Sequence, residues 1–290
     1  MTLYMKEMFL SPPEITKGFV EVGYKKTTSP ILRLLLLGIL AGAFIAFASE
    51  GSNAAIHTIE SVGIGKALAG ALFATGLMLV IIAGGELFTG NCLIVISCLE
   101  GKSKWSGMFI NWFFVYIGNF IGSVFIAYLI LQSGQLGFSH GMLGGFTIKV
   151  AAYKTGLTFM NAFSMGILCN WLVCLAIWMA SAAKDITGKL WAIFFPIWLF
   201  ITSGFEHSVA NMYYIPAGIF AKTNPQFVAE AAKLGVTPEK LAGLNWGSFV
   251  TKNLLPVTLG NIVGGVVLVG IVYWLSYMWN DKTVENRGQA

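Results

Sequence analysis

Long apolar stretches alternate with short polar ones along most of the chain. Residues 105–131, 155–183 and 253–279 each lack a charged side chain and exceed the roughly 20 residues that a helix needs to cross a bilayer. A fourth apolar segment runs from about Ser29 to Ser49. This pattern predicts an all-α membrane protein that crosses the bilayer several times.

Two further apolar segments are each interrupted by a short polar stretch. They are residues 67–83 and 92–99, interrupted at 84–91 (GGELFTGN), and residues 191–202 and 209–220, interrupted at 203–208 (SGFEHS). At about 1.5 Å per residue, residues 92–99 rise only about 12 Å, which is too little to cross the bilayer alone. We therefore expect six transmembrane helices, of which the second and the fifth are broken.

The same polar motifs occur in both halves of the chain. The pattern N-x6-GN-xx-G is found at Asn111–Gly122 and again at Asn253–Gly264. The pattern E-xxxx-N is found at Glu86–Asn91 and at Glu206–Asn211, in the two interrupted segments. Because three spans are an odd number, the second copy must be inverted in the membrane. The sequence thus predicts an inverted 3+3 repeat, an arrangement that places a substrate site near the midplane.

The repeat also predicts the domain organisation. We expect one channel domain at residues 29–279, with repeat one at about 29–131 and repeat two at about 155–279, preceded by a cytoplasmic segment at 1–28 and followed by a cytoplasmic tail at 280–290. Of the 18 Lys and Arg residues, 11 fall on the side of the termini and 7 on the other side. Because cytoplasmic loops carry the excess of these residues, both termini are expected in the cytoplasm, in a multi-pass protein of the cell inner (plasma) membrane.

The composition narrows the class of protein further. The chain is 56% hydrophobic and 11% charged, against roughly a quarter charged in soluble domains. The net charge of +5 is spread through loops without a basic block, so we expect no nucleic-acid partner. The four cysteines lie in apolar stretches without CxxC spacing, and no cofactor motif or nucleophile–base pair is visible. We therefore expect no metal, no cofactor and no enzymatic activity.

Three ionisable side chains fall within the expected spans, namely Glu86, Glu206 and His207. Each costs about 2.5–3.5 kcal/mol or more at the bilayer centre, and all three lie in the interruptions. The simpler interpretation of the glutamates is that they accept hydrogen bonds from backbone that the interruptions leave free. His207 is the only histidine expected inside the membrane, and its charge changes near neutral pH, so it could neutralise or protonate a passing weak acid.

Bulky apolar residues around the interruptions could seal a narrow path against hydrated ions. They are Phe73, Leu77, Leu87, Phe88 and Phe200. For any one of them, packing against lipid or core is the plainer alternative. Thr89 offers a hydroxyl within the first interruption. Lys154, at the extracytoplasmic start of the fourth segment, could attract anions, although a lysine at the end of a span usually anchors it at the interface.

At these residues the chain resembles the formate/nitrite transporter family, over roughly residues 25–280. Three motifs carry the resemblance: residues 84–91 (GGELFTGN), 169–176 (CNWLVCLA) and 203–212 (SGFEHSVANM). The resemblance implies an aquaporin-like protomer in a homopentamer, with one pore in each protomer. It also implies passage of small monovalent weak-acid anions across the lipid bilayer: formate, nitrite, hydrosulphide, acetate or lactate.

The resemblance also assigns roles to individual residues. His207 matches the central pore histidine of the family, and Thr89 matches its hydrogen-bonding partner. Asn170 and Glu206 match residues that orient the histidine. Lys154 matches the lysine of the extracytoplasmic vestibule.

The remaining implied positions lie toward the two ends of the pore. The cytoplasmic constriction is matched by Leu77, Leu87 and Phe88, and the periplasmic constriction by Phe73 and Phe200. The resemblance places a cytoplasmic counterpart of the vestibule lysine near Lys25 or Lys26.

We expect passive or proton-coupled passage of formate. The alternative is a nitrite or hydrosulphide channel on the same scaffold. The residues of the GELFTGN and CNWLVCLA motifs resemble nitrite-type members about as closely as formate-type members. A neutral-solute channel of aquaporin type is disfavoured, since the only Asn-Pro pair, Asn224-Pro225, lies outside the interruptions.

Overall fold

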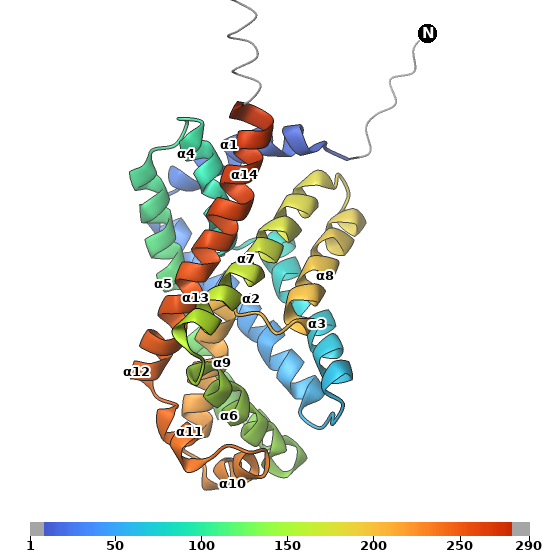
Figure 1. Ribbon diagram of the computed structural model, residues 1–290, viewed down its shortest axis with the longest axis vertical. Helices are drawn as coiled ribbons and strands as arrows, with labels where there is room; N and C mark the ends of the chain where they lie inside the picture. Colours follow the sequence, from blue (N-terminus) through green and yellow to red (C-terminus); the bar gives the residue numbers. More distant parts are fainter. Residues whose placement is uncertain (1–8, 280–290) are drawn as a thin grey trace, which may run out of the picture.

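The computed structural model describes residues 9–279, so the tail expected at 280–290 lies outside the described residues. Between residues 9 and 279 the chain folds into helices and loops, and its only strand-like pairing is an isolated bridge between Phe9 and Ala183. Figure 1 shows these helices stacked along one long axis, with both described ends of the chain at the same end of the bundle. The expectation of an all-α protein is confirmed.

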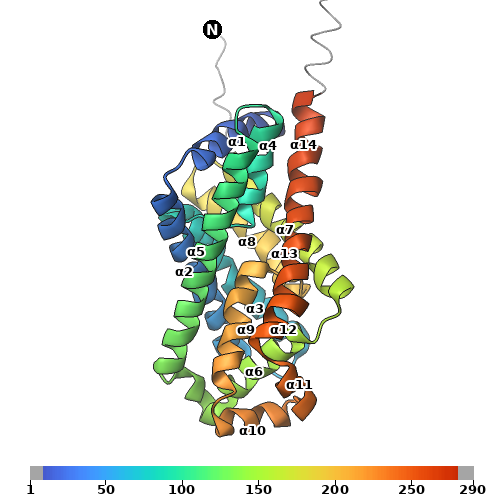
Figure 2. The ribbon, with the colours of Figure 1, turned by 90° about the vertical axis from the view of Figure 1, so that its left-hand side faces the viewer.

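Five helical segments of the described chain are long and apolar enough to cross a bilayer. They are α2 (Ile31–Ile56), α3 with its continuation η1 (Val62–Gly84), α5 (Trp105–Gln132), α7 (Phe159–Ala182) and the run from α12 through α13 and α14 to η6 (Trp246–Trp279). Figure 2 shows α5 and the run through α13 and α14 along most of the length of the molecule. The chain is therefore a multi-pass membrane protein.

Two non-helical segments separate apolar helices that follow each other along the chain. The first break, residues 85–89, separates η1 (Leu79–Gly84) from η2 (Gly90–Ile94) and α4 (Val95–Leu99). The second break, residues 203–207, separates α8 (Ile186–Thr202) from α9 (Ser208–Ala221). Gly84, the last residue before the first break, has a φ of +98°, and Gly204, within the second break, has a φ of +75°. Glycine adopts this conformation without the steric cost of a Cβ atom.

Several shorter helices lie outside the spans expected from the sequence. They are α1 (Pro12–Thr27), η3 (Gln135–Gly141), α6 (Met142–Thr155), α10 (Pro225–Lys233) and α11 (Pro238–Gly243). Helix α1 lies across the end of the bundle that carries the termini, and α10 and α11 lie at the opposite end (Figures 1 and 2). Proline in the first turn is favourable because its missing N–H would have no helical partner there, and α1, α10 and α11 all begin with one.

The sequence interpretation placed the end of the first span near Ser49, and this is wrong by about two turns. Helix α2 continues to Ile56 and carries Glu50 as a buried residue, with 3% of its surface exposed. The hydroxyl of Tyr213, on α9, donates a hydrogen bond to the Glu50 carboxyl group at 2.5 Å, which partly offsets the cost of burying it. The expectation that only three ionisable residues lie inside the spans is therefore also wrong.

Glycines allow two pairs of helices to pack closely enough for backbone contact. A Cβ atom on Gly42 of α2 would lie 2.1 Å from the carbonyl oxygen of Asn119 on α5. A Cβ atom on Gly260 of α13 would lie 2.1 Å from the carbonyl oxygen of Phe163 on α7. Small residues of this kind let membrane helices approach each other. As a result Asn119 and Asn261 are held against the two breaks.

Candidate functional site

The two breaks meet at a small cavity in the interior of the bundle. Its volume is about 10 Å³, close to the minimum that holds one water molecule. It is lined by Ile45, Phe73, Leu77, Leu87, Val173, Ile197, Phe200 and His207. His207 is thus the single polar side chain on an otherwise apolar wall.

His207 is held by hydrogen bonds at both ring nitrogens. Nδ1 accepts from the backbone N–H of Ala210 at 3.1 Å, so the side chain caps the first turn of α9. Because Nδ1 accepts, the proton of the neutral ring is assigned to Nε2, which lies 2.9 Å from the hydroxyl oxygen of Thr89. The contact between Thr89 and His207 therefore joins the first break to the second.

Asn170 contacts Thr89 and not His207 in the described structure. Its side-chain amide donates to the backbone oxygen of Thr89 at 3.2 Å and to that of Asn261 at 2.7 Å. The thiol of Cys174, one turn further along α7, also reaches the Thr89 oxygen, at 3.4 Å. Asn170 thus positions the residue that contacts the histidine.

Four of the five expected constriction residues line the cavity. The rings of Phe73 and Phe200 meet edge to face with centroids 5.7 Å apart, and the Phe200 ring lies 6.2 Å from that of His207. Leu77 and Leu87 complete the wall. Phe88 lies elsewhere: its ring packs edge-on against Tyr116, at 4.8 Å, on the wall of a groove between α5 and α13.

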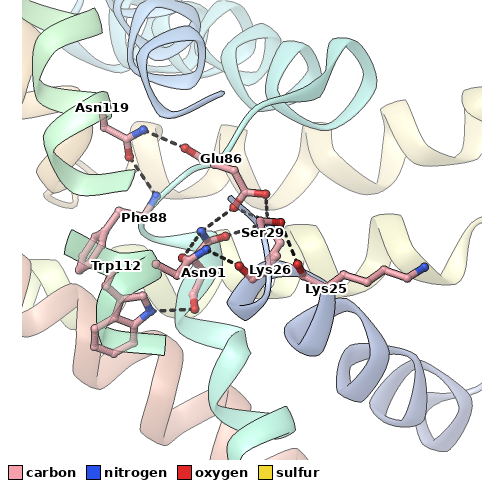
Figure 3. Close-up of polar contacts among 9 residues, drawn as sticks. Lys25, Lys26, Ser29, Glu86, Phe88, Asn91, Trp112 and Asn119 are labelled. Atoms are coloured by element: carbon pink, nitrogen blue, oxygen red, sulfur yellow. Dashed lines mark hydrogen bonds and ion pairs between the residues drawn. The ribbon is translucent and has the colours of Figure 1, made fainter. Parts of the chain in front are cut away.

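The first break is fixed by an ion pair with helix α1. The ammonium group of Lys26 lies 2.7 Å from both carboxylate oxygens of Glu86 and 2.9 Å from the side-chain oxygen of Asn91. The Asn91 amide in turn donates to Glu86 and to Asn111, at 2.7 and 2.8 Å. Figure 3 shows Lys26 pointing into this cluster and Lys25 pointing away from it. Of the two lysines, Lys26 is therefore the one that contacts the first break.

The second break has a matching ion pair, with helix α6. The ammonium group of Lys154 lies 2.8 Å from Oε1 of Glu206, while Oε2 accepts from the amide of Asn211 at 2.7 Å. The Asn211 amide also donates to the side-chain oxygen of Asn253, at 2.7 Å. Glu206 thus neutralises Lys154 and makes no hydrogen bond with the neighbouring His207 ring in the described structure.

Two asparagines hold the backbone of the breaks. The side chain of Asn119 accepts from the N–H of Phe88 at 2.9 Å and donates to the carbonyl oxygens of Gly38 and Glu86, each at 2.8 Å. Asn261 makes the equivalent bonds with Ser208 (2.9 Å), Gly166 (2.8 Å) and Glu206 (3.1 Å). The motif N-x6-GN-xx-G carries both residues, but its spacing did not reveal this role. The repeated contacts are what an internal duplication would produce.

A larger cavity, of about 380 Å³, opens beside the second break and is called the far vestibule here because it lies away from α1. Its wall includes Asn53, Lys66, Lys154, Phe205, Glu206 and Tyr214. The side chain of Lys154 lines this space and is 12% exposed. Within residues 9–279 no cluster of three or more His, Cys, Asp and Glu side chains could hold a metal ion.

Comparison with known proteins gives a consistent result over nearly the whole chain. A sequence model described as "Formate/nitrite transporter" matches residues 13–275. The chain is 36% identical to the formate channel FocA of Escherichia coli K12, over 93% of this chain and 95% of that protein. It is 38% identical to a probable formate transporter of Methanothermobacter thermautotrophicus, over 94% of this chain and 99% of that protein.

A solved structure agrees with these sequence matches. It is a pentameric formate channel with formate bound, and it is 38% identical to this chain. The similarity covers 86% of this chain and 98% of the other, with a TM-score of 0.75. Together with the sequence matches, this shows that the chain belongs to the formate/nitrite transporter family.

Proposed function

We propose that this protein conducts formate and related small monovalent weak-acid anions across the membrane, through a path that passes the His207 cavity. The observation that carries the proposal is the single polar side chain in that cavity, where His207 faces an otherwise apolar wall at the junction of the two breaks. Relatives named as formate channels, and a similar structure with formate bound, support formate as the substrate.

The apolar wall sets the chemistry that passage requires. The free-energy cost of losing the hydration shell in this cavity is large for an anion and much smaller for the neutral acid. The side chains that exclude water there are Phe73, Phe200, Leu77 and Leu87. A proton taken up from water at the entrance, or from His207 in its imidazolium form in the cavity, would let formic acid cross the apolar section. The proton would be released where the path becomes aqueous again, which makes flux proton-coupled.

The two lysines serve the entrances in this scheme. Lys154 has one ion-pair contact with Glu206, so its remaining N–H groups can face an anion in the far vestibule. Lys26 faces the other entrance, although Glu86 and Asn91 occupy its N–H groups more fully. An ammonium group near an opening concentrates anions there by electrostatic attraction.

The assembly and orientation belong to the same proposal. We infer a homopentamer in the cell inner membrane, with six spans in an inverted repeat and both termini in the cytoplasm. The pentameric relative supports the assembly, and the excess of Lys and Arg on the side of the termini supports the orientation. Large apolar side chains exposed along α5, among them Phe109, Phe113 and Phe125, suit contact with lipid or with a neighbouring protomer.

Uptake of radiolabelled formate into proteoliposomes tests the function. We expect uptake that rises as the external pH falls and that unlabelled formate competes away. Strong nitrite or hydrosulphide flux without formate flux would show that the proposed path conducts a different anion. Water or glycerol flux without any anion flux would contradict the proposal, and protein-free liposomes provide the baseline.

A further inference from the structure

Glu50 is a buried carboxyl group that the transport path described above does not use. It lies in α2, within a membrane-spanning segment, and 3% of its surface is exposed. No Lys, Arg or His forms an ion pair with it among the described residues. An ionisable residue in a membrane span is costly and commonly marks an ion or proton path.

The hydrogen bonds of Glu50 are incomplete in a specific way. Oε2 accepts from the hydroxyl of Tyr213 at 2.5 Å, whereas Oε1 is buried without a partner in the described structure. Asn53 lies one turn further along the same face of α2, and its buried Nδ2 atom also has no partner there. A buried carboxyl oxygen and a buried amide donor one helical turn apart are the kind of polar partners that hold a buried water molecule.

Asn53 connects this pair to the far vestibule. It is 3% exposed and lines the wall of that cavity. The order of groups is therefore vestibule, Asn53, Glu50 and Tyr213, running from the aqueous space into the contact between α2 and α9. Glu50 is thus separated from the vestibule by a single turn of helix.

Few charges face Glu50 from the helices around it. On α9 the titratable neighbours are Tyr213 and Tyr214, and α5 contains no charged residue. The charged residue of α3 is Lys66, which lines the vestibule, and α6 contributes Lys154, which is paired with Glu206. A second charged residue of α6, Lys149, lines a neighbouring pocket. An ionised Glu50 would therefore lack a paired cation in a low-dielectric setting, which favours the neutral acid.

We propose that Glu50 is a protonated carboxylic acid that exchanges its proton with the far vestibule through a water molecule bound between its Oε1 and Asn53 Nδ2. This rests on the proposed function, in which an entering anion must gain a proton. The O–H bond of Glu50 breaks as a proton passes to the water, and the water releases a proton to the oxygen of the anion. A proton from vestibule water then returns to Glu50 by the same route, while Tyr213 continues to donate to Oε2.

Infrared spectroscopy of the reconstituted full-length protein tests the proton directly. We expect a carbonyl stretch of a buried, protonated carboxylic acid at neutral pH that shifts in D₂O and is lost in E50Q. The exposed Glu60 gives a matched control, and E60Q should retain the band. Absence of the band, or its persistence in E50Q, would overturn the proposal whether or not formate is the substrate.

Formate uptake tests the role of that proton. E50Q keeps a side-chain oxygen for Tyr213 but cannot release a proton, so the ratio of uptake at acidic to neutral pH should fall about a hundredfold, the low end for a positioned proton donor. N53L, which removes the amide but not Glu50, should lower the same ratio. An E50Q profile identical to those of E60Q and the unmodified protein would overturn the proposal about Glu50. Formate uptake by that variant would still support the proposed function.

Discussion

The first and second breaks share a hydrogen-bonded framework, and the residues that they present to the central cavity differ. Asn119 and Asn261 bind the backbone on both sides of the positions occupied by Leu87 and His207, so these two residues are equivalent in the two halves. Both line the central cavity. The duplicated contacts therefore fix the backbone, and in the proposed function the chemistry of the path resides in the histidine at the position where the first break has a leucine.

The ion pairs of the two breaks differ in how deeply they are buried and in how many hydrogen bonds the lysine donates. The side chains of Lys26 and Glu86 are 25% and 13% exposed, against 12% and 2% for Lys154 and Glu206. Lys26 also donates to Asn91, whereas the Lys154 ammonium makes one hydrogen bond, to Glu206. The second break is thus the more deeply buried of the two, and its lysine makes fewer hydrogen bonds, although its ammonium group also lies 5.2 Å from the centre of the Tyr214 ring.

The largest effect is expected from removing one partner of the buried ion pair. E206Q leaves the Lys154 ammonium without its counter-ion, and loss of one partner of a buried pair costs about 3–5 kcal/mol. E86Q makes the same change at the more exposed pair and should cost less. Thermal unfolding of the purified protein, followed by circular dichroism, measures both. Equal losses in the two variants would contradict the difference in burial.

Replacement of the two asparagines should instead have matched effects. N119L and N261L each remove three hydrogen bonds to backbone groups, at a net cost of about 0.5–1.5 kcal/mol for each bond. The two losses should agree within about 1 kcal/mol, because the contacts are the same. The same unfolding experiment applies. A large loss in one variant alone would show that only that asparagine supports its break.

How far the sequence predicts this structure depends on whether the signal is local. The glycines and glutamates of the interruptions are local signals, and the breaks lie at residues 85–89 and 203–207, inside the expected ranges 84–91 and 203–208. Glu50 was placed outside the first span because its partner Tyr213 lies 163 residues away. Hydropathy records the cost of a charge and not the distant group that offsets it.

The spacing of residues along the sequence does not predict the placement of Lys154 or the direction of the Phe88 side chain. Helix α6 carries Lys149 and Lys154 in a segment of mixed polarity, so it does not resemble a span, yet it delivers Lys154 to Glu206. Phe88 lies in a non-helical segment, where no period indicates which way a side chain points. The structure places its ring against Tyr116 and away from the central cavity.

The bridge between the breaks gives an intermediate effect on transport. T89V removes the hydroxyl that contacts Nε2 of His207 while keeping a β-branched shape. Loss of one hydrogen bond is worth about 0.5–1.5 kcal/mol, so formate uptake should fall by up to about tenfold. T75V, which alters an exposed threonine on α3, is the control and should leave uptake unchanged. Equal uptake in T89V and T75V would argue against a role for the bridge.

The smallest effect concerns helix α1, which delivers Lys26 to the first break and has a separate counterpart, α6, at the second. Hydrogen bonds from the side chain and the backbone N–H of Ser11 lower the pKa of Glu14 below its ordinary value. Because the folded-state pKa is lowered, this contact stabilises α1 above the ordinary pKa of the carboxyl group and is lost as the pH falls through the lowered value.

S11A should therefore move the pKa of Glu14 back toward its ordinary value and narrow the pH range in which the start of α1 is stable. NMR titration of Glu14 in the reconstituted protein measures the shift. An unchanged pKa in S11A would show that other groups stabilise the carboxylate. E239Q, at the exposed start of α11, is a distant control that should leave the Glu14 titration unchanged.

The most direct test of the central claim compares His207 with its equivalent, Leu87, in one transport experiment. Formate uptake is measured against external pH for H207N and for L87M, a change of similar volume at the equivalent position. If the chemistry resides in the histidine, H207N loses the acid-stimulated component of uptake, while L87M keeps the pH profile of the unmodified protein and differs only in rate. Retention of the full acid stimulation by H207N, or its loss in L87M alone, would contradict the claim.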